Sequence, residues 1–262
     1  MIQKITSLQN TLVKRTAELK NKKNRQKDNT FFLEGKRAIE EALTGGWEIE
    51  ALFFTAQYDQ SNIALSETKA PCYLVDEYVM NKMASTEHPQ SIGAVIHQKQ
   101  STLAEVQNKE GLLLVLDGVM DPGNLGTIIR TADAAQATGV VILDNSVDLF
   151  NPKVIRSTMG SIFHLPVITG VSKTDLKDFC QKEGISLWVT SLEDAADYHG
   201  VQWPRRLALV MGNEARGVSE ELLTMAEKKI YIPMAGRAES LNVAVAAGIL
   251  LFAYGYNSCQ SK

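Results

Sequence analysis

Short apolar runs alternate with amphipathic stretches along the whole chain, a pattern typical of α/β proteins. The run LLLVLDGV (112–119) has no polar face, which predicts a strand buried on both sides in a parallel sheet. The segment FFLEGKRAIEEALTGG (31–46) predicts a short strand followed by a helix that ends at the two glycines. Further strands are predicted at 49–55, 70–76, 91–98, 139–144, 185–191, 206–212 and 228–234, and a further helix near 76–84.

The two ends of the chain differ in polarity. Residues 8–27 predict one polar, basic helix, whereas LNVAVAAGILLFAYGY (241–256) predicts a helix that is apolar on nearly all sides and well buried. The longest apolar run, Val243 to Tyr254, is too short to span a bilayer. The first residues contain no apolar segment of the signal-peptide kind, so we expect a cytoplasmic protein with no membrane partner.

A polar stretch, QKQSTLAEVQNKEG (98–111), is the best candidate for a linker. It divides the chain into a predicted small α/β domain at residues 1–105 and a larger α/β domain at residues 106–262. A chain of 262 residues is long enough for two such domains.

Charge is unevenly distributed along the chain. The net charge of −3 does not by itself indicate a nucleic-acid partner. However, residues 1–30 carry eight basic and two acidic side chains, whereas the remainder carries 19 basic and 28 acidic ones. This asymmetry predicts either a local patch that contacts phosphates or a solvated helix face, and the composition leaves both open.

Cysteine and histidine give no sign of a metal site. The three cysteines are far apart and form no CxxC pair, so we expect free thiols in a reducing compartment. The four histidines show no ligand spacing, and we expect no bound metal.

Candidate chemistry follows three of the predicted strands, where ligands bind in open α/β sheets. In the first segment (117–139), a DPGN turn leads into a helix, with Asn124 as a plausible N-cap. Arg130 follows six residues later, so we expect both side chains near the start of that helix. The alternative is an ordinary strand–turn–helix whose arginine makes a surface ion pair.

Two more segments have the same position relative to a strand. In MGNEARGVSEELL (211–223), a Gly–Asn–Glu turn lets the backbone approach a ligand, and the turn lacks a GxGxxG or P-loop fingerprint. In IPMAGRAESLNVAVAAGILL (232–251), a loop leads to a helix expected to begin near Ser240 and Leu241. Simple helix capping, by Ser219 in the first case and by Ser240 or Asn242 in the second, is the alternative for each segment alone.

Taken in order, DPGNLGTIIRTADA, MGNEARGVS and IPMAGRAESLNVAVAAGI resemble the three motifs of the SpoU/TrmH branch of the SPOUT methyltransferases. The resemblance covers residues 106–262. The intervening NPKVIRSTMGSIFHLPV (151–167) resembles the ribosomal-RNA branch, which includes the thiostrepton-resistance methyltransferases. The N-terminal part resembles the substrate-binding domain of that family, so RNA is the implied partner, most of all 23S rRNA.

The resemblance implies a fold and a cofactor. The implied fold is a C-terminal α/β trefoil-knot domain, knotted from about Leu187 to Tyr256, with a small N-terminal α/β RNA-binding domain. Family members are usually homodimers. The implied cofactor is S-adenosylmethionine, held by backbone groups at Gly212, Ile232 and Leu241.

The resemblance also implies an RNA (ribose-2′-O)-methyltransferase activity and assigns side chains to it. Arg130 matches the proposed catalytic arginine and Asn124 its partner, while Glu214, Ser240 and Asn242 would orient the ribose. Arg130 is either the base or the group that binds phosphate and stabilises the alkoxide, since an arginine normally stays protonated. The chain departs from the family pattern at Ala215, where glycine is usual, and at Ala244, where serine is usual.

Three other functions remain open from the sequence. One is a tRNA 2′-O-methyltransferase of the same class. Another is a non-catalytic RNA-binding or ribosome-assembly protein on the same fold, although all five catalytic candidates are present. The last is a nicotinamide-dependent dehydrogenase, which the missing GxGxxG motif disfavours.

Overall fold

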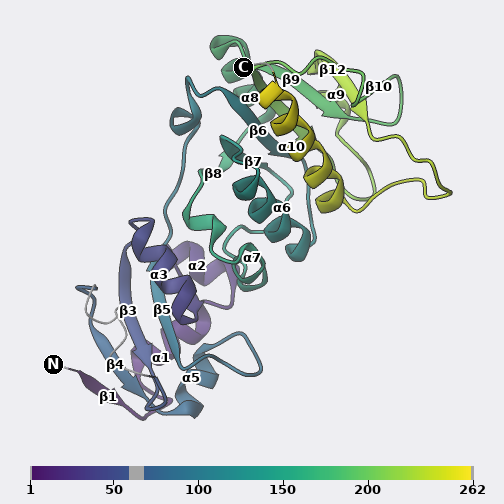
Figure 1. Cartoon of the computed structure of the whole chain (residues 1–262). Coiled ribbons are helices and arrows are strands. Elements are labelled where there is room, and N and C mark those ends of the chain that lie inside the picture. Colours follow the sequence, from purple (N-terminus) through teal and green to yellow (C-terminus); the bar gives the residue numbers. More distant parts are fainter. Residues whose placement is uncertain (1, 59–67, 261–262) are drawn as a thin grey trace. The chain divides into compact units, whose positions relative to one another are not determined.

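The computed structural model describes residues 2–58 and 68–260 of the chain (Figure 1). These residues form two compact units. The N-terminal unit comprises Met1–Lys99 together with Asp148–Phe163, and the C-terminal unit comprises Gln100–Val147 together with His164–Lys262. The division at residue 105 stays a prediction, and the segment Asp148–Phe163 packs with the N-terminal unit although it comes much later in the sequence.

The N-terminal unit is built around a five-stranded mixed sheet in the order β1-β4-β3-β5-β2. Strand β5 is antiparallel to both of its neighbours, whereas β4 is parallel to β1 and to β3. Its elements are β1 (Gln3–Ile5), α1 (Thr11–Glu18), α2 (Lys22–Asp28), β2 (Thr30–Glu34), α3 (Lys36–Thr44), β3 (Ile49–Phe54), β4 (Cys72–Val75), α5 (Glu77–Met83), β5 (Ile92–His97), α7 (Pro152–Thr158) and the 3-10 turn η2 (Ser161–Phe163).

The single basic helix predicted at residues 8–27 is wrong, because the chain forms two helices there. Helix α1 starts at the cap residue Asn10, whose side chain accepts hydrogen bonds from the amides of Leu12 and Val13. It ends at Leu19, and α2 starts after Asn21. Asparagine and the short polar linker favour capping over continuation of a helix.

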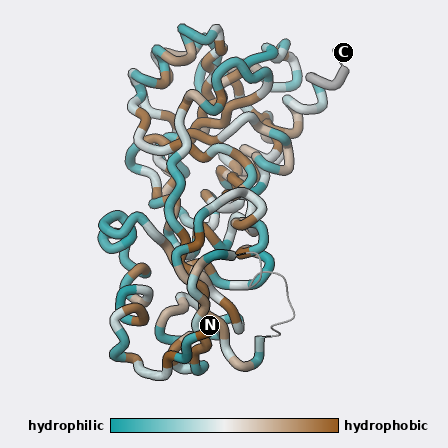
Figure 2. The backbone as a smooth tube through the Cα atoms, turned by 90° about the vertical axis from the view of Figure 1, so that its left-hand side faces the viewer, coloured by the Kyte–Doolittle hydropathy of each residue, from teal (hydrophilic) through white to brown (hydrophobic). Residues whose placement is uncertain are grey.

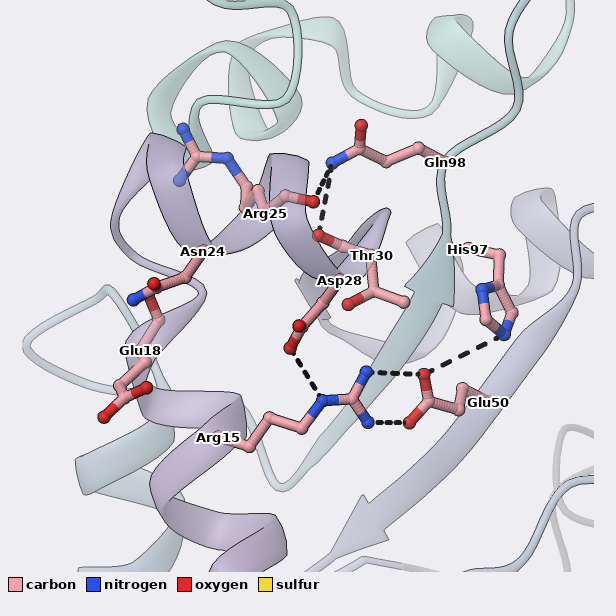
Figure 3. A network of polar contacts seen from close by, with 9 residues as sticks. All are labelled: Arg15, Glu18, Asn24, Arg25, Asp28, Thr30, Glu50, His97 and Gln98. Carbon is pink, nitrogen blue, oxygen red and sulfur yellow. Dashed lines mark hydrogen bonds and ion pairs between the residues drawn. The ribbon is translucent and has the colours of Figure 1, made fainter.

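Several basic side chains of this stretch have structural partners, and Figure 3 shows those of Arg15. Arg15 forms a two-pronged ion pair with Glu50 and donates from Nε to Asp28 at 2.7 Å. These hydrogen bonds hold the pKa of Arg15 above its usual value. Arg25 is only 3% exposed and donates to the carbonyl oxygens of Leu19 and Lys20. The basic character of residues 1–30 is therefore only partly available to a ligand.

The segment Asp148–Phe163 completes the core of the N-terminal unit. The ring of Phe150 lies 5.1 Å from that of Phe31, and the ring of Phe163 lies 5.1 Å from that of Trp47. The edge-on contact of Trp47 with Phe163 has the geometry that aromatic pairs prefer. The aromatic core of this unit is thus shared between two segments that are about a hundred residues apart in the chain.

The C-terminal unit contains a seven-stranded sheet in the order β10-β12-β9-β11-β6-β7-β8, in which neighbouring strands pair in parallel. The predicted α/β fold class is confirmed. The elements are η1 (Leu103–Val106), β6 (Gly111–Leu116), α6 (Pro122–Ala134), β7 (Gly139–Leu143), β8 (Val167–Val171), α8 (Lys173–Glu183), β9 (Ser186–Thr190), β10 (Ala196–Asp197), β11 (Arg206–Met211), α9 (Glu220–Met225), β12 (Lys228–Tyr231) and α10 (Val243–Gln260).

The predicted linker at 98–111 is partly structured. It contains η1, which begins with a capping box between Thr102 and Glu105. Val106, at the end of that turn, is 2% exposed and belongs to the core beneath β6 and β7. The boundary between the two units falls inside this stretch, after Lys99, and the part from Gln100 onward belongs to the C-terminal unit.

Helix α10 packs against α6 within the C-terminal unit. It starts at Val243, two residues after the predicted start, and buries Ala247, Leu250 and Leu251. Its predicted burial on nearly all sides is wrong, because Phe252 is 56% exposed and two further apolar residues of the same face are exposed with it. Figure 2 shows the mixture of apolar and polar positions along the chain.

The order of the strands is consistent with the knot that the resemblance implies. The last strand, β12, lies beside the earlier strand β9, and α10 returns to pack against α6. Among the helices of residues 2–58 and 68–260, none is long and apolar enough to cross a membrane.

Candidate active site at the carboxyl edge of the parallel sheet

The three candidate segments meet at one edge of the C-terminal sheet. They follow β6, β11 and β12, and the carboxyl ends of parallel strands lie at the same edge. Strand β11 pairs with β6 on one side and β9 on the other, and β9 pairs with β12. The sheet therefore brings the turn after β6 close to two loops that follow it by about 90 to 120 residues in sequence.

The turn after β11 requires glycine at its first position. A Cβ atom on Gly212 would lie 2.1 Å from the carbonyl carbon of Gly217, which no side chain can accommodate. The backbone of Asn213 exchanges two hydrogen bonds with that of Gly217, both of 2.9 Å. This closed loop leaves Glu214 exposed at its tip.

The turn after β6 is capped by an aspartate. Asp121 is the N-cap of α6, and its side chain accepts a hydrogen bond of 2.8 Å from the amide of Asn124. The predicted capping by Asn124 is therefore wrong. Because Asp121 takes that role, the Asn124 side chain in the first turn of α6 is free to contact the other loops.

The loop after β12 leads into α10 through Asn242. Its Oδ1 accepts hydrogen bonds from the amides of Ala244 (2.9 Å) and Val245 (3.3 Å). Of the two residues that the sequence offers at the start of this helix, Ser240 and Asn242, it is Asn242 that caps it. Ser240 is exposed and makes no hydrogen bond with the part of the chain that the structure describes.

Three of the predicted site residues form one hydrogen-bonded series. The side-chain nitrogen Nδ2 of Asn242 donates to Oδ1 of Asn124 at 2.9 Å, and Nδ2 of Asn124 donates to Oε1 of Glu214 at 2.9 Å. We call this series of three side chains the amide–carboxylate network. It joins the three motif segments, and it leaves the second carboxylate oxygen of Glu214 able to accept a hydrogen bond from a ligand.

Arg130 lies elsewhere on α6. It is the ninth residue of that helix, so the prediction that it lies near the helix start is wrong. Six residues correspond to about 9 Å along the axis and a rotation of about 240° from Asn124. Arg130 is exposed and makes no hydrogen bond or ion pair with the described residues. Its guanidinium can therefore contact an anionic ligand without breaking an existing pair.

The three residues predicted to hold the cofactor lie around the same edge. Gly212 follows β11, Ile232 follows β12, and Leu241 precedes Asn242. Within the described part of the chain, the backbone of Pro233 to Leu241 makes no hydrogen bond with other backbone groups. Its N–H and C=O groups, and the half-buried side chains of Ile232 and Leu241, fit a ligand that backbone contacts recognise.

The sequence pointed to no metal, and the residues described contain no group of three His, Cys, Asp or Glu side chains that could hold one. Sequence reasoning missed Asp121, Asn213 and Asp117, which hold the loops in place. The three candidate segments contain all three, but no spacing rule distinguishes a residue that ties two loops together from one that contacts a ligand.

Comparison with known proteins identifies the family. Residues 111–252, more than half of the chain, match the SpoU rRNA Methylase family. The chain belongs to the SpoU rRNA methylase family. Residues 10–94 match the MRM3-like substrate binding domain. The predicted family is confirmed, and so is the predicted enzyme class, an RNA methyltransferase that uses S-adenosylmethionine.

Relatives match over the whole length of this SpoU-family chain. It is 39% identical to the 23S rRNA (guanosine(2553)-2′-O)-methyltransferase RlmP of Bacillus subtilis, over 96% of this chain and 98% of the relative. An AdoMet-bound rRNA methyltransferase from Sinorhizobium meliloti superposes with a TM-score of 0.90 and 34% identity, covering 97% of each chain. The AdoMet complex of AviRb from Streptomyces viridochromogenes superposes with a TM-score of 0.88 and 27% identity, covering 96% of this chain and 99% of that one.

Proposed function

We propose that this SpoU-family protein transfers the methyl group of S-adenosylmethionine to a ribose 2′-hydroxyl of 23S rRNA. The observation that carries the proposal is the amide–carboxylate network, which gathers one side chain from each of the three motif segments at a single edge of the sheet. The full-length likeness to RlmP, named as a 23S rRNA 2′-O-methyltransferase, supports the choice of substrate.

The roles of the polar side chains follow from their positions. Glu214 is exposed, and Asn124 donates only to its Oε1. Its other carboxylate oxygen can accept a hydrogen bond from a ribose hydroxyl. Asn124 and Asn242 hold that carboxylate in one orientation. Ser240, exposed in the loop after β12, would donate a further hydrogen bond to the RNA.

Arg130 would bind the RNA phosphate and stabilise the negative charge that develops on the 2′-oxygen. A guanidinium stays protonated in proteins, so it suits charge stabilisation better than removal of a proton. S-adenosylmethionine supplies the electrophilic methyl group when bound. Gly212, Ile232 and Leu241 would hold it through their backbone groups, and alignment of the two reactants would supply much of the acceleration.

A homodimer is part of the proposal. Val245, Phe252 and Tyr256 are 52%, 56% and 68% exposed, and their spacing of seven and four residues places them on one face of α10. An apolar stripe of this kind is typical of a helix that packs against a partner. We propose that a second copy of the chain covers it, and that the enzyme works in the cytoplasm, where rRNA is modified.

The test is transfer of labelled methyl from S-adenosylmethionine to unmodified RNA, followed by mapping of 2′-O-methyl groups. Purified 23S rRNA, large ribosomal subunits and total tRNA are assayed side by side, with the Asn124→Ala variant as the control for contaminating activity. A single labelled ribose in 23S rRNA supports the proposal. Label in tRNA alone would overturn the substrate, and absence of label from all three, despite cofactor binding, would indicate a non-catalytic RNA-binding protein.

A further inference from the structure

Two side-chain contacts tie the loop after β11 to the turn after β6, and neither belongs to the amide–carboxylate network. Strands β6 and β11 run in register up to Leu116 and Met211, and the amide of Asp117 still donates to the Met211 carbonyl at 2.9 Å. Beyond this point the two chains separate into different loops. Beyond the paired strands, the two loops are joined by side-chain hydrogen bonds instead of backbone ones.

The first contact comes from Asp117. Its Oδ2 accepts a hydrogen bond of 2.8 Å from the amide of Ser219, the residue directly before α9. Asp117 is 7% exposed, and Nζ of Lys173 lies 4.0 Å from its other oxygen. A buried carboxylate that accepts a backbone hydrogen bond fixes the far end of the loop firmly, because its loss would leave the amide of the half-buried Ser219 without this partner.

The second contact comes from Asn213. Its Nδ2 donates to the carbonyl oxygen of Gly118 at 2.7 Å. Its Oδ1 accepts from the amides of Ala215 (2.9 Å) and Arg216 (3.1 Å) inside the loop. One side chain thus shapes the tip of the loop and attaches the near end to the turn after β6.

Glu214 lies between these two attachments, directly after Asn213. Its partner Asn124 lies in the first helical turn of α6. Asp117 lies seven residues earlier, at the start of the connection from β6 to α6. We infer that Asp117 and Asn213 are positioning residues for methyl transfer, because they set the place of Glu214 relative to Asn124. The inference rests on the proposed function. It adds two residues that are not expected to touch RNA or cofactor.

The test compares Asp117→Ala with Asp117→Asn. Both remove the charge next to Lys173, but only asparagine keeps an oxygen that can accept from the Ser219 amide. We measure kcat at saturating RNA and S-adenosylmethionine, both Michaelis constants, and the thermal midpoint. We expect Asp117→Ala to lower kcat about tenfold or more, since a displacement of roughly 1 Å can cost about a hundredfold, whereas Asp117→Asn recovers most of the rate.

A second variant keeps the inference testable if Asp117→Ala does not fold. Asn213→Asp retains the acceptor for the Ala215 and Arg216 amides but replaces the donor to Gly118 with a carboxylate oxygen. We expect it to lower kcat as well, with the Michaelis constants changing less. Equal kcat in Asp117→Ala and Asp117→Asn, or wild-type kcat in Asn213→Asp, would overturn the inference. Failure of the wild-type protein to methylate any RNA would instead overturn the proposed function.

Discussion

The buried guanidinium of Arg25 donates to Oδ2 of Asp148 at 2.5 Å, across 123 residues of sequence and within the N-terminal unit. The side chain of Arg25 is 3% exposed and that of Asp148 is 19% exposed, so water screens the pair little. This contact fastens the returning segment Asp148–Phe163 to α2. It also removes Arg25 from the set of basic side chains that can bind RNA.

We therefore expect Arg25→Ala to destabilise the protein by about 3 kcal/mol, the cost of leaving a mostly buried charge without its partner. Urea denaturation followed by tryptophan fluorescence measures this loss, since Trp47 contacts Phe150 and Phe163 in the same core. The matched control is Lys22→Ala on the same helix, which is exposed and should change the free energy of unfolding by no more than about 0.5 kcal/mol. Equal effects of the two variants would contradict the structural role of Arg25.

The exposed lysines of α2 remain candidates for RNA binding. Lys22, Lys23 and Lys27 are exposed, whereas Lys20 donates to the carbonyl oxygen of Lys82. Burial in turn lowers the pKa of Lys20. We expect the triple substitution of the three exposed lysines by glutamate to weaken RNA binding. The slope of log affinity against log salt concentration should become less steep by roughly 0.7 to 0.9 for each phosphate contact that is lost.

Filter binding at salt concentrations from about 50 to about 200 mM measures both quantities. Lys182→Glu is the matched control, because Lys182 is an exposed lysine on α8 of the C-terminal unit. If the triple variant binds as the wild type does, these lysines form only a solvated helix face.

Removal of Arg130 should separate catalysis from stability. Arg130 is exposed and has no partner among the described residues, so Arg130→Ala should change the free energy of unfolding by less than about 0.5 kcal/mol. We expect it to abolish methyl transfer while cofactor binding, measured by calorimetry, stays close to that of the wild type. Arg130→Lys retains a charge and should recover part of the rate if the role is phosphate binding. Near-normal transfer by Arg130→Ala would refute the assignment.

Sequence patterns were sufficient for elements whose signal is local. The apolar run at 112–119 predicted β6, and the apolar tail predicted α10. The prediction of one helix over residues 8–27 was wrong, because helix periodicity does not reveal that one helix ends at Leu19 and another begins after Asn21. The short strand β8 (Val167–Val171) was missed, since it contains a glycine at positive φ and two exposed positions.

At the candidate site, sequence patterns could not predict which residues contact one another. The motif strings contained Asn124, Glu214 and Asn242, but their hydrogen bonds join positions that are 90 and 118 residues apart. No periodicity carries that information, because it depends on the order of strands in the sheet. The N-cap of α6 was missed for a local reason, because the DPGN turn offers two good capping residues; Asp121 takes the role predicted for Asn124 and leaves the Asn124 side chain to the network.

Burial of Cys180 predicts a slow thiol. Desolvation, and next the charge of Glu227, raise the pKa of Cys180 to about 12. At pH 8 its thiolate fraction is then about one in ten thousand, roughly a thousandfold below that of an unperturbed cysteine. Iodoacetamide labelling followed by peptide mass spectrometry should modify Cys72, which is half-buried, well before Cys180, and should modify both in urea. Faster labelling of Cys180 in the folded protein would contradict its placement in the core.

Asn242 has two separable functions, and its two substitutions distinguish them. Its Oδ1 caps α10, and its Nδ2 donates to Asn124. Asn242→Asp keeps the cap and loses the donor, whereas Asn242→Ala loses both. We expect only the alanine variant to lose stability, by about 1 kcal/mol, the usual cost of removing an N-cap side chain.

Methyl transfer should fall in both variants of Asn242, because each leaves Asn124 free to rotate away from Glu214. The aspartate variant is the sharper test, since its helix cap is intact and any loss of kcat comes from the network. Thermal unfolding and kcat measured on the same preparations give both quantities. If Asn242→Asp transfers methyl groups at the wild-type rate, the donor to Asn124 has no part in the reaction and Asn242 acts only as a helix cap.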